Sequence, residues 1–477
     1  MLVSTRTTRT LRYADDMEVA AADAAIFVGT FVAALANDLF EDATGSSRHS
    51  RTSRHGRLCR PRTRRSVDDI YAQLGPVYFR RAYRMKFASF KRLANELRPY
   101  ILQAAGHKGG GRTRHVPNGR ISPDVRLACA IRWFAGGSPY DMMTTFGVSH
   151  TEVVNSYWYV VDAVNKHPKF TIKYPEDHNA QYTIAQGFHK VSRAGFKCCA
   201  GAIDGILIWI HKPSREDCLD NGCDKGKFFC GRKKKFGLNC QAVCDVRGRI
   251  LDISILYPGS TSDCLVFEGM SLFPKLEEGI LAPGLCIFGD NAYLNTPHMA
   301  TPFAAVGGGT MDSYNFYHSQ LRIRIECTFG MLTKRWGILR SAIPVGVTVA
   351  KTVALVLALA MLHNYCIDAH DDDADSRRVT REDLTHLPTD EWNIELNGGV
   401  PLVATGGMEN GNNVIPQQLM HGGHHSDDVG GTSGRYNRQR RYNYVSETSR
   451  VSLPRDQLHS YIASIGVTRP TPLPRRR

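Results

Sequence analysis

The sequence predicts an α/β protein in which a mixed sheet flanked by helices follows an all-α region, with disordered segments at both ends. Three observations support this prediction. Apolar residues recur with a helical period over about 69–178, with a strand period over 196–300, and with a helical period again from Gln320. Residues 1 to about 45 hold one possible amphipathic helix and no clear motif, and the sequence after Asp368 is first acidic and then rich in Gly and Asn.

These changes in pattern predict four regions. They are a basic flexible region (1–68), a helical region (69–178), an α/β domain (179–370) and a mostly disordered tail (371–477). With 42% hydrophobic residues among 477, the chain can bury a sizeable core. We therefore expect the two middle regions to carry the folded structure.

The charge balance predicts a polyanionic partner. The chain has 60 Lys and Arg against 45 Asp and Glu, a formal net charge of +15, which favours nucleic acid first and an anionic membrane surface second. The apolar stretch Val19–Phe40 is interrupted by two aspartates, and Val353–Leu362 spans only about ten residues. No membrane partner is therefore expected.

The cysteines are expected to be free thiols of an intracellular protein. There are thirteen, and several lie in apolar runs, as Cys198 and Cys240 do. No secretory signal is recognisable at the start of the chain. Cys218, Cys223 and Cys230 lie close together, but no paired Cys-x-x-Cys accompanies them, so zinc is not expected.

The amino-terminal region holds a basic run between Ala43 and Val67 that contains no acidic residue. Such a run does not pack into a core. Two interpretations stay open, a nuclear-import or phosphate-binding patch and a plain basic linker. Its arginines are Arg48, Arg51, Arg54, Arg57, Arg60, Arg62, Arg64 and Arg65.

The helical region has the outline of a helix-turn-helix. Val125–Phe134 reads as one helix, Ser138 and Pro139 begin a second that Gly147 ends, and Ser149 caps a third. In that motif the last helix, Thr151–Val164, enters the major groove of DNA. The alternative is a helical bundle without DNA contact.

The α/β domain shows strands followed by helices. Strands are predicted at Ala202–Ile210, Phe236–Cys244, Arg249–Leu256 and Leu285–Phe288, and helices at Gln320–Arg340 and Val349–Cys366. Asp245-Val246-Arg247-Gly248 reads as a hairpin turn between the second and third strands.

Three acidic residues are candidates for catalysis. Asp204 lies within an apolar strand, where a bare carboxylate is costly unless paired or bound to metal. Asp290 directly follows the short strand Leu285–Phe288, and Glu326 lies on the later helix. Carboxylates at strand ends and on one helix face can bind two Mg²⁺ or Mn²⁺ ions for phosphodiester chemistry. The alternatives are a helix cap at Asp290 and a surface position at Glu326.

Basic residues near these carboxylates are candidates for binding DNA phosphates. Arg322 precedes Glu326 by four residues and therefore shares its helix face, so a simple intrahelical ion pair is the alternative. The candidates are Lys225, Lys227, Arg232, Lys233, Lys234, Lys235, Arg322, Arg324, Lys334 and Arg335.

Five motifs in order resemble the nuclease domain of PIF/Harbinger-type transposases, the DDE superfamily endonuclease or plant transposon protein family. They extend over about 180–367. They are Gly201-Ala202-Ile203-Asp204-Gly205, Tyr257-Pro258-Gly259-Ser260-Thr261-Ser262-Asp263, Gly289-Asp290-Asn291-Ala292-Tyr293-Leu294, Arg322-Ile323-Arg324-Ile325-Glu326-Cys327-Thr328-Phe329-Gly330 and Leu362-His363-Asn364-Tyr365. Thirty-five residues separate Asp290 from Glu326, a spacing familiar in DDE transposases.

The resemblance implies an RNase H-like core, a catalytic triad of Asp204, Asp290 and Glu326, and a nuclear protein. It also implies cutting at terminal inverted repeats, attack of the freed 3′ hydroxyl on target DNA, and often a Myb-like accessory protein; a homo-oligomer is also considered. Ile206 stands where many relatives have Thr, and Asn291-Ala292 where many have Ser-Gly. These departures leave every carboxylate in place and put only the subfamily in doubt.

Several assignments stay open at the level of sequence. Asp263 is either a fourth metal ligand or a turn residue, and His363 is expected to be a packed, hydrogen-bonded side chain rather than a ligand. The main alternative function is a domesticated, transposase-derived DNA-binding protein that does not cleave. A metal-dependent hydrolase of RNA or nucleotides is a third hypothesis, which the basic composition disfavours.

Overall fold

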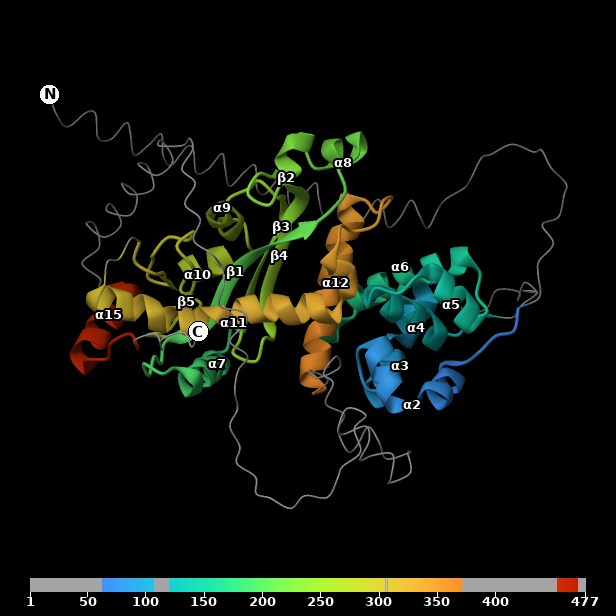
Figure 1. Cartoon of the computed structure of the whole chain (residues 1–477), viewed down its shortest axis with the longest axis horizontal. Coiled ribbons are helices and arrows are strands. Elements are labelled where there is room, and N and C mark those ends of the chain that lie inside the picture. Colours follow the sequence, from blue (N-terminus) through green and yellow to red (C-terminus); the bar gives the residue numbers. More distant parts are fainter. Residues whose placement is uncertain (1–61, 107–119, 305, 307, 371–452, 471–477) are drawn as a thin grey trace, which may run out of the picture. The chain divides into compact units, whose positions relative to one another are not determined.

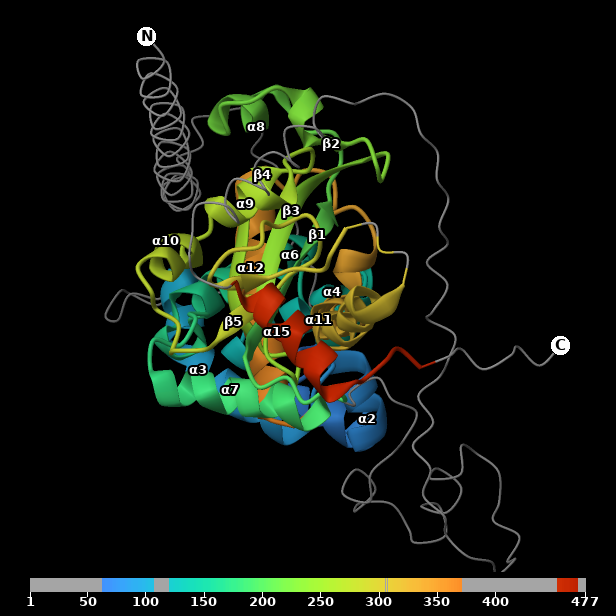
Figure 2. The same cartoon turned by 90° about the vertical axis from the view of Figure 1, so that its left-hand side faces the viewer.

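The computed structural model describes residues 62–106, 120–304, 306, 308–370 and 453–470. Residues 1–61 of the predicted flexible region 1–68 therefore lie outside the described residues, as do most of the predicted tail and the arginines before Arg62. Figures 1 and 2 show the arrangement of the described elements.

The helical region begins with capped helices, as the sequence predicts. The hydroxyls of Ser122, Ser138 and Ser149 accept backbone N–H bonds at the starts of α4, α5 and α6, and Gly147 ends α5 with a φ of 61°. The helices are α2 (Val67–Tyr83), α3 (Phe87–Ala104), α4 (Pro123–Phe134), α5 (Pro139–Phe146), α6 (His150–Lys166) and α7 (His178–Val191), with the 3₁₀ turn η1 (Pro168–Phe170) before α7.

Helix α6 packs one face within the helical region. Between Thr151 and Lys166, only these two end residues are exposed, while the centre of the helix packs within the bundle. Tyr157 stacks on Trp133 of α4, with ring centroids 4.3 Å apart. A groove-binding helix needs a free face, and several residues of α6 are partly exposed, so the entry of Thr151–Val164 into the major groove stays a prediction.

The sheet has the strand order of an RNase H-like fold, which confirms the predicted fold class. Strands β4, β3 and β1 form an antiparallel meander, and β5 and β6 continue the sheet in parallel with β1. The strands are β1 (Cys199–Trp209), β2 (Phe229–Cys230), β3 (Lys235–Cys244), β4 (Ile250–Pro258), β5 (Cys286–Phe288) and β6 (Met299–Ala300).

Helices cover both faces of this sheet (Figure 1). Alternate strand residues point to opposite faces: Ile203 and Ile287 pack toward Phe267 of α9, and Ala202 and Phe288 toward α11. The elements concerned are α8 (Arg215–Asp220), η2 (Lys225–Phe228), α9 (Asp263–Glu268), α10 (Leu272–Glu277), α11 (Gly309–Arg335), η3 (Gly337–Arg340) and α12 (Val349–Asp368).

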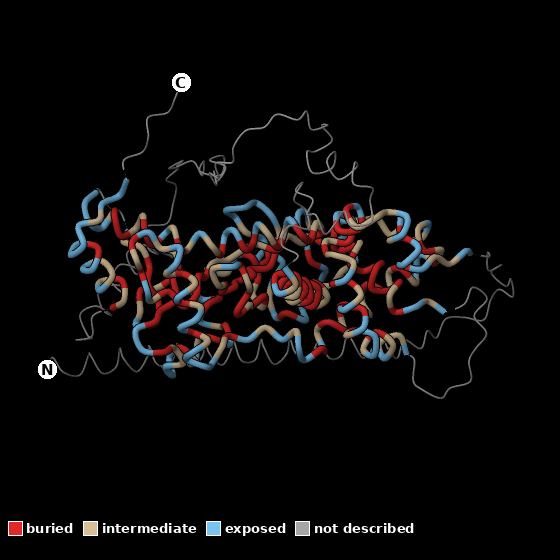
Figure 3. The backbone as a smooth tube through the Cα atoms, turned by 90° about the horizontal axis from the view of Figure 1, so that it is seen from below, coloured by how far each residue is buried: buried red, intermediate tan, exposed pale blue. Residues whose placement is uncertain are grey.

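Helix α12 is longer than the apolar run Val353–Leu362 suggested. Its 20 residues are long and apolar enough, by length and composition, to cross a membrane, and 72% of the most apolar window is buried inside the protein. Figure 3 shows the buried positions running through the interior. Such burial is typical of a core helix.

Helix α15 (Pro454–Ile465) lies within the region predicted to be mostly disordered. Leu458 and Ile462, four residues apart, pack with the residues of α11, and Ile462 is fully buried. The Arg455 guanidinium lies 4.4 Å from the centroid of the Phe303 ring. The prediction for this segment was wrong because a short amphipathic face within polar sequence gives a weak signal on its own.

Candidate active site

Asp204 and Asp290 lie side by side because of the register of two parallel strands. Ala202 of β1 pairs with Phe288 of β5, and each aspartate follows its partner residue by two positions. Both side chains therefore lie at the same level of the sheet and on the same face. Only 21% of the Asp204 side chain is exposed.

Glu326 lies on α11 and is connected to Asp204 by Arg322, which pairs with both carboxylates. The Arg322 Nη1 atom lies 3.2 Å from Asp204 Oδ2, and Nη2 donates to Glu326 Oε1 one helical turn away. The predicted intrahelical ion pair is therefore present, and it extends to β1. The Arg322 side chain is only 18% exposed. Solvent therefore screens the attraction between Arg322 and Asp204 less than it screens an ion pair on the surface.

Burial and the repulsion between neighbouring negative charges disfavour the ionised forms of Asp204 and Asp290. Burial raises the pKa of Asp204 to about 6; the nearby charges of Asp290 and Glu326 act in the same direction, and the Gly205 N–H and Arg322 oppose it. Burial also raises the pKa of Asp290, while the Ala292 N–H, 2.8 Å from Asp290 Oδ1, opposes that shift. A cation among these groups stabilises their charged forms.

The donor set fits a hard divalent ion in its chemistry. Asp204, Asp290 and Glu326 offer carboxylate oxygens, the ligands that Mg²⁺ and Mn²⁺ prefer. Within the described residues, no three carboxylate, imidazole or thiol groups stand close enough to hold one ion. The guanidinium of Arg322 lies between Asp204 and Glu326 and pairs with both carboxylates.

Asp263 comes close to the same site from the opposite face of the sheet. It is the first residue of α9, and its Oδ1 accepts a hydrogen bond of 2.9 Å from Asn239 Nδ2 of β3. A Cβ atom added to Gly205, the neighbour of Asp204, would lie 2.8 Å from that oxygen. The carboxylate thus packs directly against the backbone of β1.

A basic hairpin, Phe229–Phe236, connects the α8 region to β3. Phe229 pairs with Phe236 and Cys230 with Lys235, and Lys234 turns the chain with a φ of 51°. The pKa of Asp290 is raised overall, and the positive charge of Arg232 opposes this rise. This indicates that the tip of the hairpin lies near the carboxylates. The predicted phosphate contacts of this segment are all exposed: Lys225, Lys227, Arg232, Lys233, Lys234 and Lys235.

The basic residues of α11 differ in their surroundings. Lys334 is exposed and Arg324 is partly buried. Arg335 is only 6% exposed, and its Nη1 donates a hydrogen bond of 2.8 Å to the Arg84 carbonyl. A guanidinium buried between two elements does not reach a phosphate, so the assignment of Arg335 to DNA binding is wrong.

The predictions for His363 and the cysteines are confirmed within the described part of the chain. His363 is fully buried, and its Nε2 lies 3.0 Å from the Gly248 carbonyl oxygen. Burial lowers its pKa to about 4. The described cysteines, including Cys218, Cys223 and Cys230, are free thiols.

Residue-level reasoning from the sequence missed Asn239 and Gln241. Both lie in β3 and are nearly or completely buried, with 7% and 0% exposure. The available signal was the alternation Leu238-Asn239-Cys240-Gln241 inside an apolar strand, since buried amides require partners.

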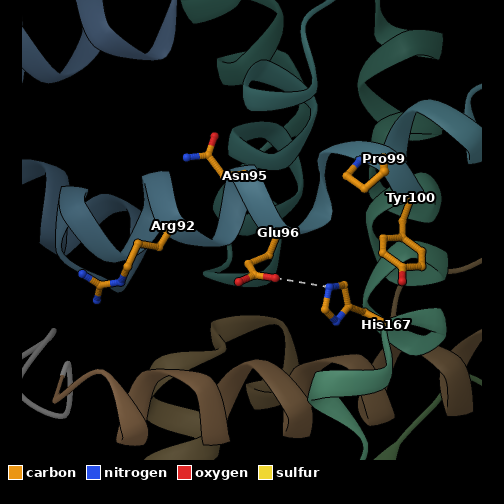
Figure 4. A pocket seen from close by; sticks show the side chains of 6 residues that line it. All are labelled: Arg92, Asn95, Glu96, Pro99, Tyr100 and His167. Carbon is orange, nitrogen blue, oxygen red and sulfur yellow. Dashed lines mark ion pairs between the residues drawn. The ribbon is translucent and has the colours of Figure 1, made fainter.

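A pocket away from the carboxylates belongs to the helical region (Figure 4). Its Glu96 lies 3.6 Å from His167 Nε2 and 2.8 Å from Lys169 Nζ. These charges satisfy one another, so the pocket carries no functional assignment. The lining residues are Arg92, Asn95, Glu96, Pro99, Tyr100 and His167.

This fold, with paired carboxylates on adjacent strands and a third on the following helix, defines a nuclease-like domain of the DDE class. Residues 203–364 match the family described as DDE superfamily endonuclease, which confirms the resemblance found in the motifs. Most of the α/β domain is thus similar to this family. Members of this superfamily generally use divalent metals.

Similar proteins from animals and plants extend this relationship. The chain is 27% identical over 262 residues to "Putative nuclease HARBI1" of Bos taurus, covering 54% of this chain and 71% of that protein. It is 28% identical over 262 residues to the protein of the same name from Rattus norvegicus, with the same coverage. It is 23% identical over 284 residues to "Protein ALP1-like" of Arabidopsis thaliana, covering 55% and 65%. No solved structure matches the chain.

Proposed function

We propose that the protein is a metal-dependent DNA endonuclease of the transposase kind, which cuts DNA at transposon ends and joins them to target DNA. The observation that carries this proposal is the placement of Asp204 and Asp290 on adjacent parallel strands, with Glu326 joined to Asp204 through Arg322. The family match over 203–364 supports the same reaction class.

The chemistry requires an activated oxygen and a stabilised leaving oxygen. Two Mg²⁺ or Mn²⁺ ions held by Asp204, Asp290 and Glu326 would supply both. Water adds across a phosphodiester and leaves a 3′ hydroxyl, which then attacks a target phosphodiester and releases the target's own 3′ oxygen. In each step one P–O bond forms and one breaks.

The basic residues hold the polyanionic substrate against the repulsion of the carboxylates. The exposed tip of the basic hairpin carries four consecutive cations, Arg232–Lys235, and the charge of Arg232 acts on Asp290. Arg322, once turned from Asp204, offers a planar guanidinium for a phosphate. These contacts position the duplex without reading its sequence.

A second candidate is a domesticated DNA-binding protein that does not cleave. The observation that favours it is the Arg322 bridge, which holds Asp204 and Glu326 while no three ligand groups converge in the described residues. In this reading Arg322 permanently serves as the cation of the site. DNA binding that weakens with salt, without metal-dependent cleavage, is its expected behaviour.

The test is plasmid cleavage in Mg²⁺ or Mn²⁺. The purified full chain is compared with a triple variant, Asp204→Ala, Asp290→Ala and Glu326→Ala, and with a control that removes three exposed carboxylates, Asp141→Ala, Glu216→Ala and Glu278→Ala. We expect metal-dependent nicking by the native chain and the control only. Equal nicking by all three overturns the assignment of the triad, and intact DNA binding without nicking supports the second candidate.

The resemblance to Harbinger-type transposases also supports three proposals about context. The protein acts in the nucleus, it assembles as a homo-oligomer on DNA, and a Myb-like protein assists recognition of terminal inverted repeats. Microscopy of the tagged full chain, its mass in solution with and without DNA, and cleavage assays with the accessory protein added test them separately.

A further inference from the structure

Two buried amides of β3 are directed at Asp263. Asn239 Nδ2 donates to Asp263 Oδ1 at 2.9 Å and to the Thr261 carbonyl at 3.0 Å, and Gln241 Nε2 donates to the Asp263 carbonyl at 2.7 Å. Burying an amide within a sheet is costly, and these bonds offset the cost. The amides therefore fix both the turn before α9 and the orientation of the carboxylate.

Gly205 leaves the space that this carboxylate needs. Gly205 pairs with Gln241 across β1 and β3, next to Asp204. A Cβ at Gly205 would stand 2.8 Å from Asp263 Oδ1 and 3.3 Å from Asn239 Oδ1, closer than side chains tolerate.

Several oxygens around Asp263 are buried without a hydrogen-bond donor. Within the described residues, Asn239 Oδ1, Gln241 Oε1 and the Tyr293 hydroxyl are buried and have no partner. Buried polar atoms without partners are rare, and each of them requires a physical reason. Here they accompany a carboxylate whose second oxygen, Oδ2, makes no hydrogen bond that the described residues account for.

A purely structural role explains Asp263 less well. As the first residue of α9, it would serve as a cap if it accepted bonds from the helix's own amides. Within the described residues, Asp263 instead accepts hydrogen bonds from the side chains of Asn239 and Gln241. Ser262, the N-cap residue of α9, makes no side-chain capping bond. The arrangement holds the carboxylate against β1 at Gly205, the neighbour of Asp204, and these contacts do not cap the helix end.

We infer that Asp263 is a fourth carboxylate of the divalent-metal site, held in position by Asn239 and Gln241. This inference rests on the proposed metal-dependent function. Asp263 approaches from the face opposite Glu326, so the donors surround the Asp204–Asp290 pair from both sides of the sheet. Asn239 and Gln241 are positioning residues that act through Asp263.

The test measures Mn²⁺ binding to the full chain, by calorimetry and by the electron paramagnetic resonance signal of free Mn²⁺. The variant Asp263→Asn keeps an oxygen for Asn239 but loses the charge. We expect it to lower Mn²⁺ affinity by tenfold or more, or to remove one of two bound ions. The matched control Glu268→Gln removes the same charge from an exposed position on α9 and is expected to bind as the native chain does.

A steric variant tests the position of the carboxylate without changing charge. Gly205→Ala places a methyl group against Asp263 Oδ1 and is expected to weaken Mn²⁺ binding as Asp263→Asn does. Thermal unfolding without metal shows whether each variant is folded; if Gly205→Ala is not, the decision rests on Asp263→Asn.

The variant Asp204→Asn distinguishes a failure of the inference about Asp263 from a failure of the proposed metal-dependent function. If it weakens Mn²⁺ binding while Asp263→Asn binds normally, the inference about Asp263 is overturned and the proposed function stands. If the native chain binds no Mn²⁺ with or without DNA, both are overturned.

Discussion

At the scale of single residues, buried charges organise this site. Asp204 and Asp290 are forced together by the strand register, and Arg322 supplies the positive charge that keeps Asp204 tolerable inside the protein. Removing one partner from such a contact leaves a buried charge uncompensated, which is costly. The contact with Arg322 therefore offsets part of the cost of burying Asp204.

Asp252 of β4 allows a test of how a buried carboxylate affects stability outside this site. It is 6% exposed, its Oδ2 has no hydrogen-bond partner within the described structure, and burial raises its pKa to about 6. An unfolded aspartate titrates near pH ~3.9. The folded protein therefore binds more protons between these values, and stability falls as the pH rises through that window.

We predict that Asp252→Asn stabilises the protein by about 1–3 kcal/mol at pH 7.5, and that the gain disappears below about pH 4. Urea unfolding of native chain and variant at several pH values measures the difference. Glu278→Gln, at an exposed position, is the control and should change little. A gain for Asp252→Asn that is independent of pH contradicts the prediction.

The sequence predicted the carboxylates but not the contacts that orient them. Asp204 could be recognised because an acidic residue in an apolar strand requires compensation. The Arg322–Asp204 contact joins residues 118 positions apart, and Asn239 meets Asp263 only after two strands and a turn are in place. Such contacts depend on tertiary register, which periodicity does not contain.

At the scale of elements, the first and last residues of helices and strands were easier to predict than the neighbours that pack against them. Predicted strand Phe236–Cys244 corresponds to β3 at Lys235–Cys244, and Ser149 caps α6 as expected. The period of α6 shows that one face is apolar, not how many neighbours cover its other faces; there Trp158 and Tyr159 are partly buried.

The basic hairpin is the element whose role in DNA binding is most directly testable. We predict that Arg232→Gln, Lys233→Gln and Lys234→Gln together weaken DNA binding tenfold or more near physiological salt. They should also reduce the slope of log affinity against log salt by about 2–3, because up to three phosphate contacts are lost. Binding to a labelled duplex at several salt concentrations measures both quantities.

The matched control for the hairpin removes three exposed cations at the other end of the domain. Lys190→Gln, Arg193→Gln and Lys197→Gln lie in and just after α7, which Figures 1 and 2 place away from β2. This variant should keep a near-native slope. Equal losses in both variants would mean that net charge, not the hairpin, governs binding.

At the scale of the whole described fold, the helical region and the α/β domain share one core. Leu97 and Ile131 of the bundle belong to the same buried cluster as Leu238 of the sheet and Leu355 of α12. Hydrogen bonds cross between the regions: Asn165 Nδ2 donates to the Ala354 carbonyl at 2.9 Å, and the Tyr365 hydroxyl to the Ser89 carbonyl at 2.7 Å. The change of period near residue 179 marks the change from the helical region to the α/β domain. The two regions nevertheless pack as one compact unit.

A shared core predicts cooperative unfolding of both regions. Leu97→Ala, at a fully buried position of α3, should cost about 2–5 kcal/mol. Because the regions unfold together, hydrogen exchange of the β3 amides, far along the chain from Leu97, should quicken by the same free energy as exchange in α4. The reciprocal variant Leu321→Ala, fully buried on α11, should quicken exchange in α4. Faster exchange confined to the mutated region would show that the bundle and the nuclease domain open independently, and the bundle would then be free to move while the carboxylate site stays intact.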